Sequence, residues 1–96
     1  FCHGIIFLSE ERSFMMETRL AILAVIVEKP EATQQLNQLL HRYMDDIIGR
    51  MGLPYHERDI CLISIAMDAP QEHISALAGQ IGRIDGVSVK TAYASR

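Results

Sequence analysis

The chain has 96 residues, of which 49% are hydrophobic and 22% charged, and its formal net charge is −3. These values describe one ordinary globular domain with a single core, too small to enclose a large internal active site. The acidic balance argues against a broad contact with nucleic acid, and no apolar run is long enough to span a bilayer, so neither nucleic acid nor a membrane is expected as a partner.

The two cysteines do not make a disulfide framework. Cys2 lies in a terminal segment, whereas Cys61 lies inside an apolar run. This usage suits a reducing compartment, and we therefore expect a cytoplasmic protein.

An N-terminal extension is expected over residues 1–15, followed by the domain at residues 16–96. Met16 stands just before the first apolar run of the domain, after a polar segment at residues 9–13. The apolar residues 4–8 have no basic segment before them and no small-residue cleavage site after them, so a signal peptide is not expected.

A first strand is expected over residues 18–27, where apolar side chains fill nearly every position and β-branched residues gather at the end. A helix should begin near Pro30, because proline is tolerated in the first helical turn and Glu31 favours the positive end of the helix dipole. The apolar residues that follow recur at intervals of three and four, which predicts one buried helical stripe. This stripe would consist of Ala32, Leu36, Leu39, Leu40, Tyr43, Met44 and Ile47.

The second strand, at residues 47–55, contains two glycines and a proline, which suit a sheet edge better than a central position. A polar turn at residues 56–59 leads into the almost wholly apolar run at residues 60–67, which we expect to pair antiparallel with the second strand. The sequence therefore predicts a hairpin with one irregular edge strand and one buried strand.

A second helix is expected after Asp68, whose carboxylate is a candidate cap for the free backbone amides. Its buried stripe would be formed by Ile74, Leu77, Ala78 and Ile81. After a turn at residues 85–86, residues 87–94 alternate apolar and polar side chains, as a strand with one wet face should.

The order strand, helix, strand, strand, helix, strand predicts an α+β fold, the ferredoxin-like (βαββαβ) sandwich, with an antiparallel four-stranded sheet and two helices on one face. The first and third strands would be central. Both are apolar on two faces, and the helices can cover only one of them. We therefore expect a second copy on the other face, in a homodimer or homotetramer.

Arg50 is the charged side chain most suggestive of binding, because a guanidinium beside open backbone can hold a carboxylate or phosphate. Its neighbours Gly49 and Gly52 have the spacing of a weak phosphate loop, although irregularity of an edge strand explains them as well. A solvated edge arginine is the plain alternative. With Lys29, in the loop after the first strand, these residues form the candidate contacts for an effector or partner.

A metal site is a second hypothesis, using Cys61 with His56 or His41, against the alternative of an ordinary polar turn beside a buried cysteine. No cofactor is assigned. The adjacent carboxylates Asp45 and Asp46 should point apart, and no serine or cysteine stands in a nucleophile motif, so we do not expect an enzyme.

Several segments closely resemble the iron-only hydrogenase system regulators, and the resemblance runs from about residue 16 to residue 94. They lie at residues 16–23, 34–41, 47–55, 68–71 and 86–90. That family is similar in fold to ligand-binding ACT domains and to the C-terminal domain of the nickel-responsive repressor. The resemblance implies an ACT-like regulator that senses a small molecule or a metal as an oligomer.

Two departures from those relatives are visible. ACT domains that bind amino acids usually carry a glycine in the loop after the first strand, where this chain has Lys29 and Pro30. The two histidines of the nickel repressor correspond here to Leu53 and Tyr55. The chain also lacks a helix-turn-helix or basic ribbon for DNA. A ligand-free partner of hydrogenase maturation proteins is therefore a further alternative to a sensor.

Overall fold

The computed structural model describes residues 17–95, and the expected N-terminal extension at residues 1–15 lies outside this range. Secondary structure fills most of the described chain. In order, the elements are β1 (Arg19–Val27), α2 (Ala32–Arg42), the 3-10 turn η1 (Met44–Asp46), β2 (Ile47–Tyr55), β3 (Ile60–Ala69), α3 (Gln71–Gly82) and β4 (Val87–Tyr93).

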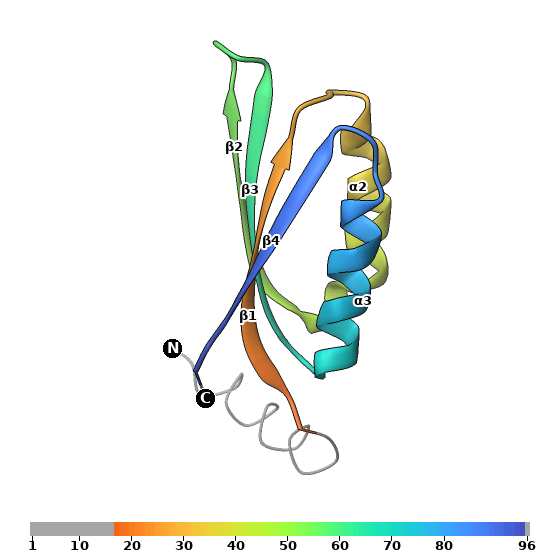
Figure 1. The fold of residues 1–96 in the computed structure, drawn as a ribbon, viewed down its shortest axis with the longest axis vertical. Coiled ribbons are helices and arrows are strands. Elements are labelled where there is room, and N and C mark those ends of the chain that lie inside the picture. The colour runs from red at the N-terminus through yellow and green to blue at the C-terminus, as the bar shows by residue number, and fades with distance from the viewer. Residues whose placement is uncertain (1–16, 96) are drawn as a thin grey trace.

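The four strands form one antiparallel sheet in the order β2-β3-β1-β4. Both helices lie on the same side of this sheet, and no element of residues 17–95 covers the other side (Figure 1). The predicted ferredoxin-like fold is thus confirmed, with the two apolar runs as the central strands β1 and β3.

The core fills the space between the sheet and the helices. Along β1, Leu23 and Val25 are buried while the residues between them face outward, and Ile65 at the centre of β3 is fully buried. The helices close this layer with apolar side chains that are buried almost completely, namely Ala32, Leu36, Leu39 and Leu40 from α2 and Ile74, Leu77 and Ile81 from α3. Burial of each large aliphatic side chain contributes roughly 1.5 to 3 kcal/mol.

The first helix is shorter than the predicted stripe. It ends at Arg42, and the chain then makes a 3-10 turn before Ile47 adopts extended backbone angles. Because the helical spacing is broken there, Met44 is 57% exposed and its assignment to the buried stripe was wrong. Tyr43 and Ile47 nevertheless pack against the core.

Asp68 does not cap the second helix, contrary to the prediction. Strand β3 continues to Ala69, and Asp68 is paired with Leu20 of β1. The N-cap of α3 is Pro70, which makes no side-chain capping hydrogen bond. Asp68 stays in strand β3 because β1 continues to pair with β3 up to Ala69.

Two polar contacts join the helical layer laterally. The Gln80 amide donates a hydrogen bond to the Tyr43 hydroxyl over 2.9 Å, and His73 Nδ1 lies 2.8 Å from a carboxylate oxygen of Asp46. Both contacts connect α3 to the segment that follows α2. Among residues 17–95, no helix has the length and apolar character required to cross a bilayer.

Candidate functional site

Arg50 lies on the edge strand β2, on the side of the sheet that carries the helices. It pairs with the buried Ile65 of β3, which fixes this orientation because side chains of paired residues share a face. Its guanidinium Nη2 donates a hydrogen bond to Asn37 Oδ1 over 3.0 Å. Arg50 therefore bridges from the edge of the sheet to α2.

The two glycines beside Arg50 leave open space. A Cβ atom added at Gly49 or Gly52 would meet no atom within 4 Å, and neither residue has a positive φ. Neither the backbone conformation nor the packing of the described chain requires glycine at these positions. The surface is consequently open at Gly52 on the face that carries Arg50, and at Gly49 on the opposite face of the sheet.

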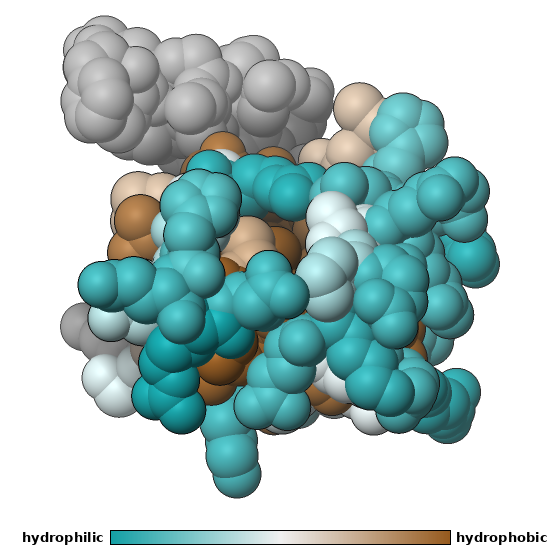
Figure 2. Space-filling view, turned by 90° about the horizontal axis from the view of Figure 1, so that it is seen from above, coloured by the Kyte–Doolittle hydropathy of each residue, from teal (hydrophilic) through white to brown (hydrophobic). Residues whose placement is uncertain are grey.

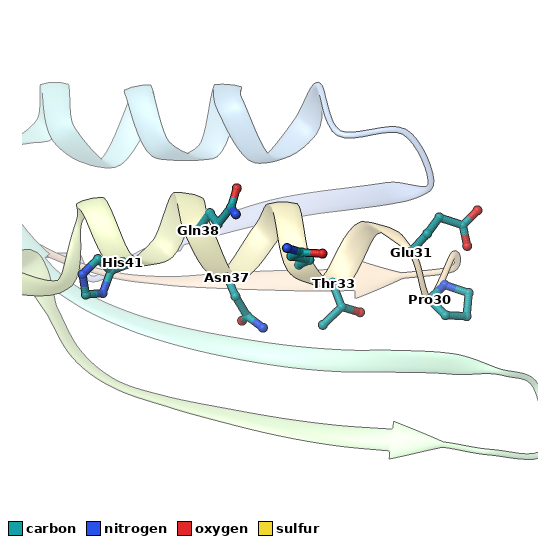
Figure 3. Close-up of a pocket in the computed structure, with 7 residues that line it drawn as sticks. Pro30, Glu31, Thr33, Asn37, Gln38 and His41 are labelled. Atoms are coloured by element: carbon teal, nitrogen blue, oxygen red, sulfur yellow. The ribbon is translucent and has the colours of Figure 1, made fainter.

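Asn37 belongs to a polar face of α2. Figure 3 shows Asn37 and Thr33 on the side of the helix toward β2 and β3, and Gln38 on the side toward α3. A shallow pocket of about 750 Å³ follows this face and is lined by Pro30, Glu31, Thr33, Gln34, Asn37, Gln38 and His41. Asn37 thus connects the Arg50 guanidinium to a surface rich in amide and hydroxyl groups.

Lys29 is held elsewhere. Its ammonium donates a hydrogen bond to Asp85 over 2.6 Å. This bond and the charge of Asp85 raise the pKa of Lys29, and the same bond lowers the pKa of Asp85. Asp85 precedes β4, at the opposite sheet edge from Arg50 in β2. The structure does not bring Lys29 together with Arg50, Gly49 and Gly52.

The candidate metal ligands are divided between two places. His56 and Cys61, with Asp59, line a pocket of about 250 Å³ near the start of α2, to which Thr33 also contributes. His41 lies eight residues further along that helix, a separation of about 12 Å at the helical rise. Residues 17–95 contain no group of three or more His, Cys, Asp or Glu side chains placed to hold a metal ion.

Sequence reasoning missed Asn37. A single polar residue on the outer face of an amphipathic helix gives no sign of its partner, and Arg50 lies on a different element. Only the register of β2 against β3 turns Arg50 toward α2. The nearby glycines pointed to Arg50, but nothing in the sequence pointed to its partner Asn37.

The sequence model of the family described as "Iron-only hydrogenase system regulator, putative" (TM1266-like) matches residues 19–91. The chain belongs to this family. The match covers every element from β1 to most of β4, so the family of iron-only hydrogenase system regulators shares the whole described fold with this chain.

A solved structure of this kind is that of uncharacterized protein TM1266 from Thermotoga maritima. It is 37% identical to this chain and superposes with a TM-score of 0.77, covering 80% of this chain and 98% of the other. Its fold agrees with the ferredoxin-like arrangement found here.

Curated relatives carry the name "Putative nickel-responsive regulator". Those of Saccharolobus islandicus (strain L.S.2.15 / Lassen #1) and Saccharolobus solfataricus (strain P2) are each 29% identical over 66 residues, which is 69% of this chain and 49% of theirs. The chain therefore spans about half the length of these relatives.

Proposed function

We propose that this member of the iron-only hydrogenase system regulators is a non-enzymatic sensing domain that binds a small anionic effector through Arg50. The observation that carries the proposal is the Arg50 guanidinium, which Asn37 holds at 3.0 Å on the same face of the sheet as Gly52, where a Cβ atom would meet only open space. A guanidinium recognises carboxylate and phosphate groups by paired hydrogen bonds.

Donor capacity supports this role. A guanidinium has five N–H donors, and the hydrogen bond to Asn37 engages one of them. An anion can therefore contact the remaining donors while Asn37 keeps the side chain turned toward α2. Gly52, which shares the helix-bearing face of the sheet with Arg50, contributes no side chain that would compete for the same space.

Nucleic acid is not part of the proposed function of this domain. Aspartate and glutamate total 12 residues against 9 of lysine and arginine, and phosphate binding by nucleic-acid proteins depends on an excess of positive charge. A single arginine at a strand edge suits one small anion better than a polyanion.

A metal-sensing role through Cys61 and His56 is the second candidate, because both line one pocket and the matched Saccharolobus proteins are named nickel-responsive regulators. His41 would join such a site only from another subunit. Metal analysis of protein purified without a histidine tag tests this candidate: a stoichiometric metal that is lost in Cys61→Ala would favour it over the anion site.

The anion site is tested by a thermal-shift screen with amino acids, nucleotides, inorganic phosphate and divalent metals. We expect at least one anion to stabilise the wild-type chain, Arg50→Ala to lose this shift, and Arg50→Lys to retain little of it because lysine lacks the planar fork. Arg58→Ala, in the exposed turn after β2, is the matched control and should respond like wild type.

An identical response of Arg50→Ala and wild type to every anion would contradict the proposal. A screen in which no compound shifts any variant would instead favour a ligand-free partner of hydrogenase maturation proteins.

A further inference from the structure

The sheet has a second face, opposite the helices, on which apolar side chains dominate. We call it the open face. β1 presents Leu20, Ile22, Ala24 and Ile26 to it, β3 presents Ile60, Leu62, Ser64 and Ala66, and β2 presents Gly49, Met51, Leu53 and Tyr55. Apart from Ile60, its large apolar side chains are between 39% and 71% exposed. The end of the molecule at the β2-β3 turn is, by contrast, covered mainly by hydrophilic residues (Figure 2).

Charge is nearly absent from the open face. Among the described residues of the four strands, the charged side chains that point to it are Lys90 on the outer strand β4 and Asp68 at one end of β3. On the central strands β1 and β3, the middle of the face has no charge for a polar partner to match. An anionic membrane surface is disfavoured as well, because the chain is net acidic.

The size of the face fits a protein interface. Four strands about 4.8 Å apart, and nine residues of β1 rising about 3.4 Å each, give a surface of roughly 19 by 30 Å. Two such faces in contact would bury about 1,100 Å² before the relief of the side chains is counted, which is above the lower limit of roughly 1,000 Å² for a specific interface.

Side-chain size varies along the strands. One row across the sheet contains the large side chains of Leu53, Leu62 and Ile26, whereas the row four residues away contains Gly49, Ala66 and Ile22. The row between them contains Met51 and Lys90 on the two outer strands and the small Ser64 and Ala24 on the two central strands. Two pockets of about 480 and 420 Å³ lie on the face, one at each of these ends.

From these observations we infer that the open face binds a second copy of this chain, related by a two-fold axis that runs across the strands above Ser64 and Ala24. This axis places the large row of each copy on the small row of the other. Leu62 then lies over the partner copy's small Ala66 position and Leu53 over a glycine position, which keeps the spacing of the two sheets even near 10 Å.

A two-fold axis parallel to the strands would instead place the row of large side chains of one copy on the same row of the other. The rows of small side chains would then be too far apart to touch. Lys90 pairs with Ala24, so the chosen axis places it opposite Lys90 of the second copy. Because it lies on the outer strand, its long stem lets each ammonium reach water at the edge of the interface.

The first test is the mass of the full chain in solution by light scattering. We expect a dimer or a multiple of it, at least twice the 10.8 kDa of one chain. Leu62→Glu should shift the protein to monomer while retaining its circular dichroism spectrum. Met44→Glu, at a more exposed apolar residue of η1 away from the sheet, should leave the mass unchanged. A wild-type monomer at micromolar concentration, or an unaffected Leu62→Glu dimer, would overturn the inference.

The second test concerns the axis and does not depend on a destabilising variant. In a chain with Cys2→Ser and Cys61→Ala, a single Ser64→Cys change should give a dimer that a short bis-maleimide cross-links, because the two copies of residue 64 face each other at the proposed axis; a direct disulfide could not span two sheets about 10 Å apart. Ser75→Cys, exposed on α3, is the control and should react with the reagent without linking two chains. A dimer in which Ser64→Cys does not cross-link would rule out this arrangement, as would efficient cross-linking through Ser75→Cys.

Discussion

The aliphatic stem of Lys29 lies directly against Gly86. A Cβ atom built on Gly86 would approach Lys29 Cγ to 2.6 Å, and Gly86 has a φ of +84°. The same turn is closed by a 2.7 Å hydrogen bond from the Glu28 amide to the Gly86 carbonyl. Gly86 is thus required both for its backbone angle and for the space that Lys29 occupies.

Gly86→Ala should destabilise the chain by about 1 to 3 kcal/mol, since a left-handed residue with a side chain is strained and the contact lies near the root of Lys29 rather than at its flexible end. Chemical denaturation measures the effect. Gly79→Ala is the matched control, because a Cβ there meets nothing within 4 Å in the interior of α3. It should stabilise by up to about 1 kcal/mol. Equal effects of the two changes would contradict this account.

The Lys29 and Asp85 pair predicts a pH dependence with two limits. The hydrogen bond from Lys29 lowers the pKa of Asp85. The ionised Asp85 therefore stabilises the fold above about pH 3.8, and this contribution is lost as the pH falls through the lower pKa of the folded state. The pKa of Lys29 is raised. The charged Lys29 therefore stabilises the fold below about pH 10.5, and this contribution is lost as the pH rises through the higher pKa of the folded state. NMR titration of the Lys29 side chain should show its pKa return toward 10.5 in Asp85→Asn.

Arg50→Ala should change the free energy of unfolding by no more than about 0.5 kcal/mol, because Arg50 is exposed and its one hydrogen bond is to an exposed side chain. Anion binding should nevertheless be lost. Asn37→Ala leaves the guanidinium in place without its tether and should weaken binding less. An Arg50→Ala chain that melts several degrees early and binds normally would make Arg50 structural.

Ile65 and Ile22 lie on opposite faces of the sheet, on neighbouring strands. Truncating Ile65 should lower the stability of the single chain, whereas truncating Ile22 should lower the affinity between copies. Ile65 is fully buried, so Ile65→Ala should cost about 2 to 5 kcal/mol at any protein concentration. Ile22 is 50% exposed in one chain. Ile22→Ala should mainly weaken association, which makes the change in Tm depend on concentration. A concentration series of thermal melts distinguishes the two, and parallel behaviour would count against an interface at Ile22.

The arrangement of strands could be predicted because burial leaves a direct trace in sequence. Runs that are apolar at nearly every position, such as residues 60–67, can only be central, and the glycines and proline of residues 47–55 indicate an edge. The prediction went wrong where two rules competed. At Met44 helical spacing continues in the sequence after the helix has ended, and at Asp68 a good capping residue lies within reach of a longer strand.

The candidate site could be predicted only in part, because it joins elements that are distant in sequence. Arg50 stood out through its glycine neighbours, whereas its contact with Asn37 depends on strand register. Lys29 was chosen for its loop, and nothing local indicates that Asp85, 56 residues later, holds its ammonium. Residue type identifies the candidate binding residues, and contacts between distant parts of the chain decide which of them remain able to bind a ligand.

The irregularity of β2 has a consequence for how far an assembly can grow. An exposed strand edge is a template on which further strands can add, and a long regular edge would allow such addition to continue. The register shift between Ile47 and Gly49 and the missing amide hydrogen of Pro54 interrupt that template. The chain can therefore expose one apolar sheet face to a partner while its β2 edge resists open-ended polymerisation.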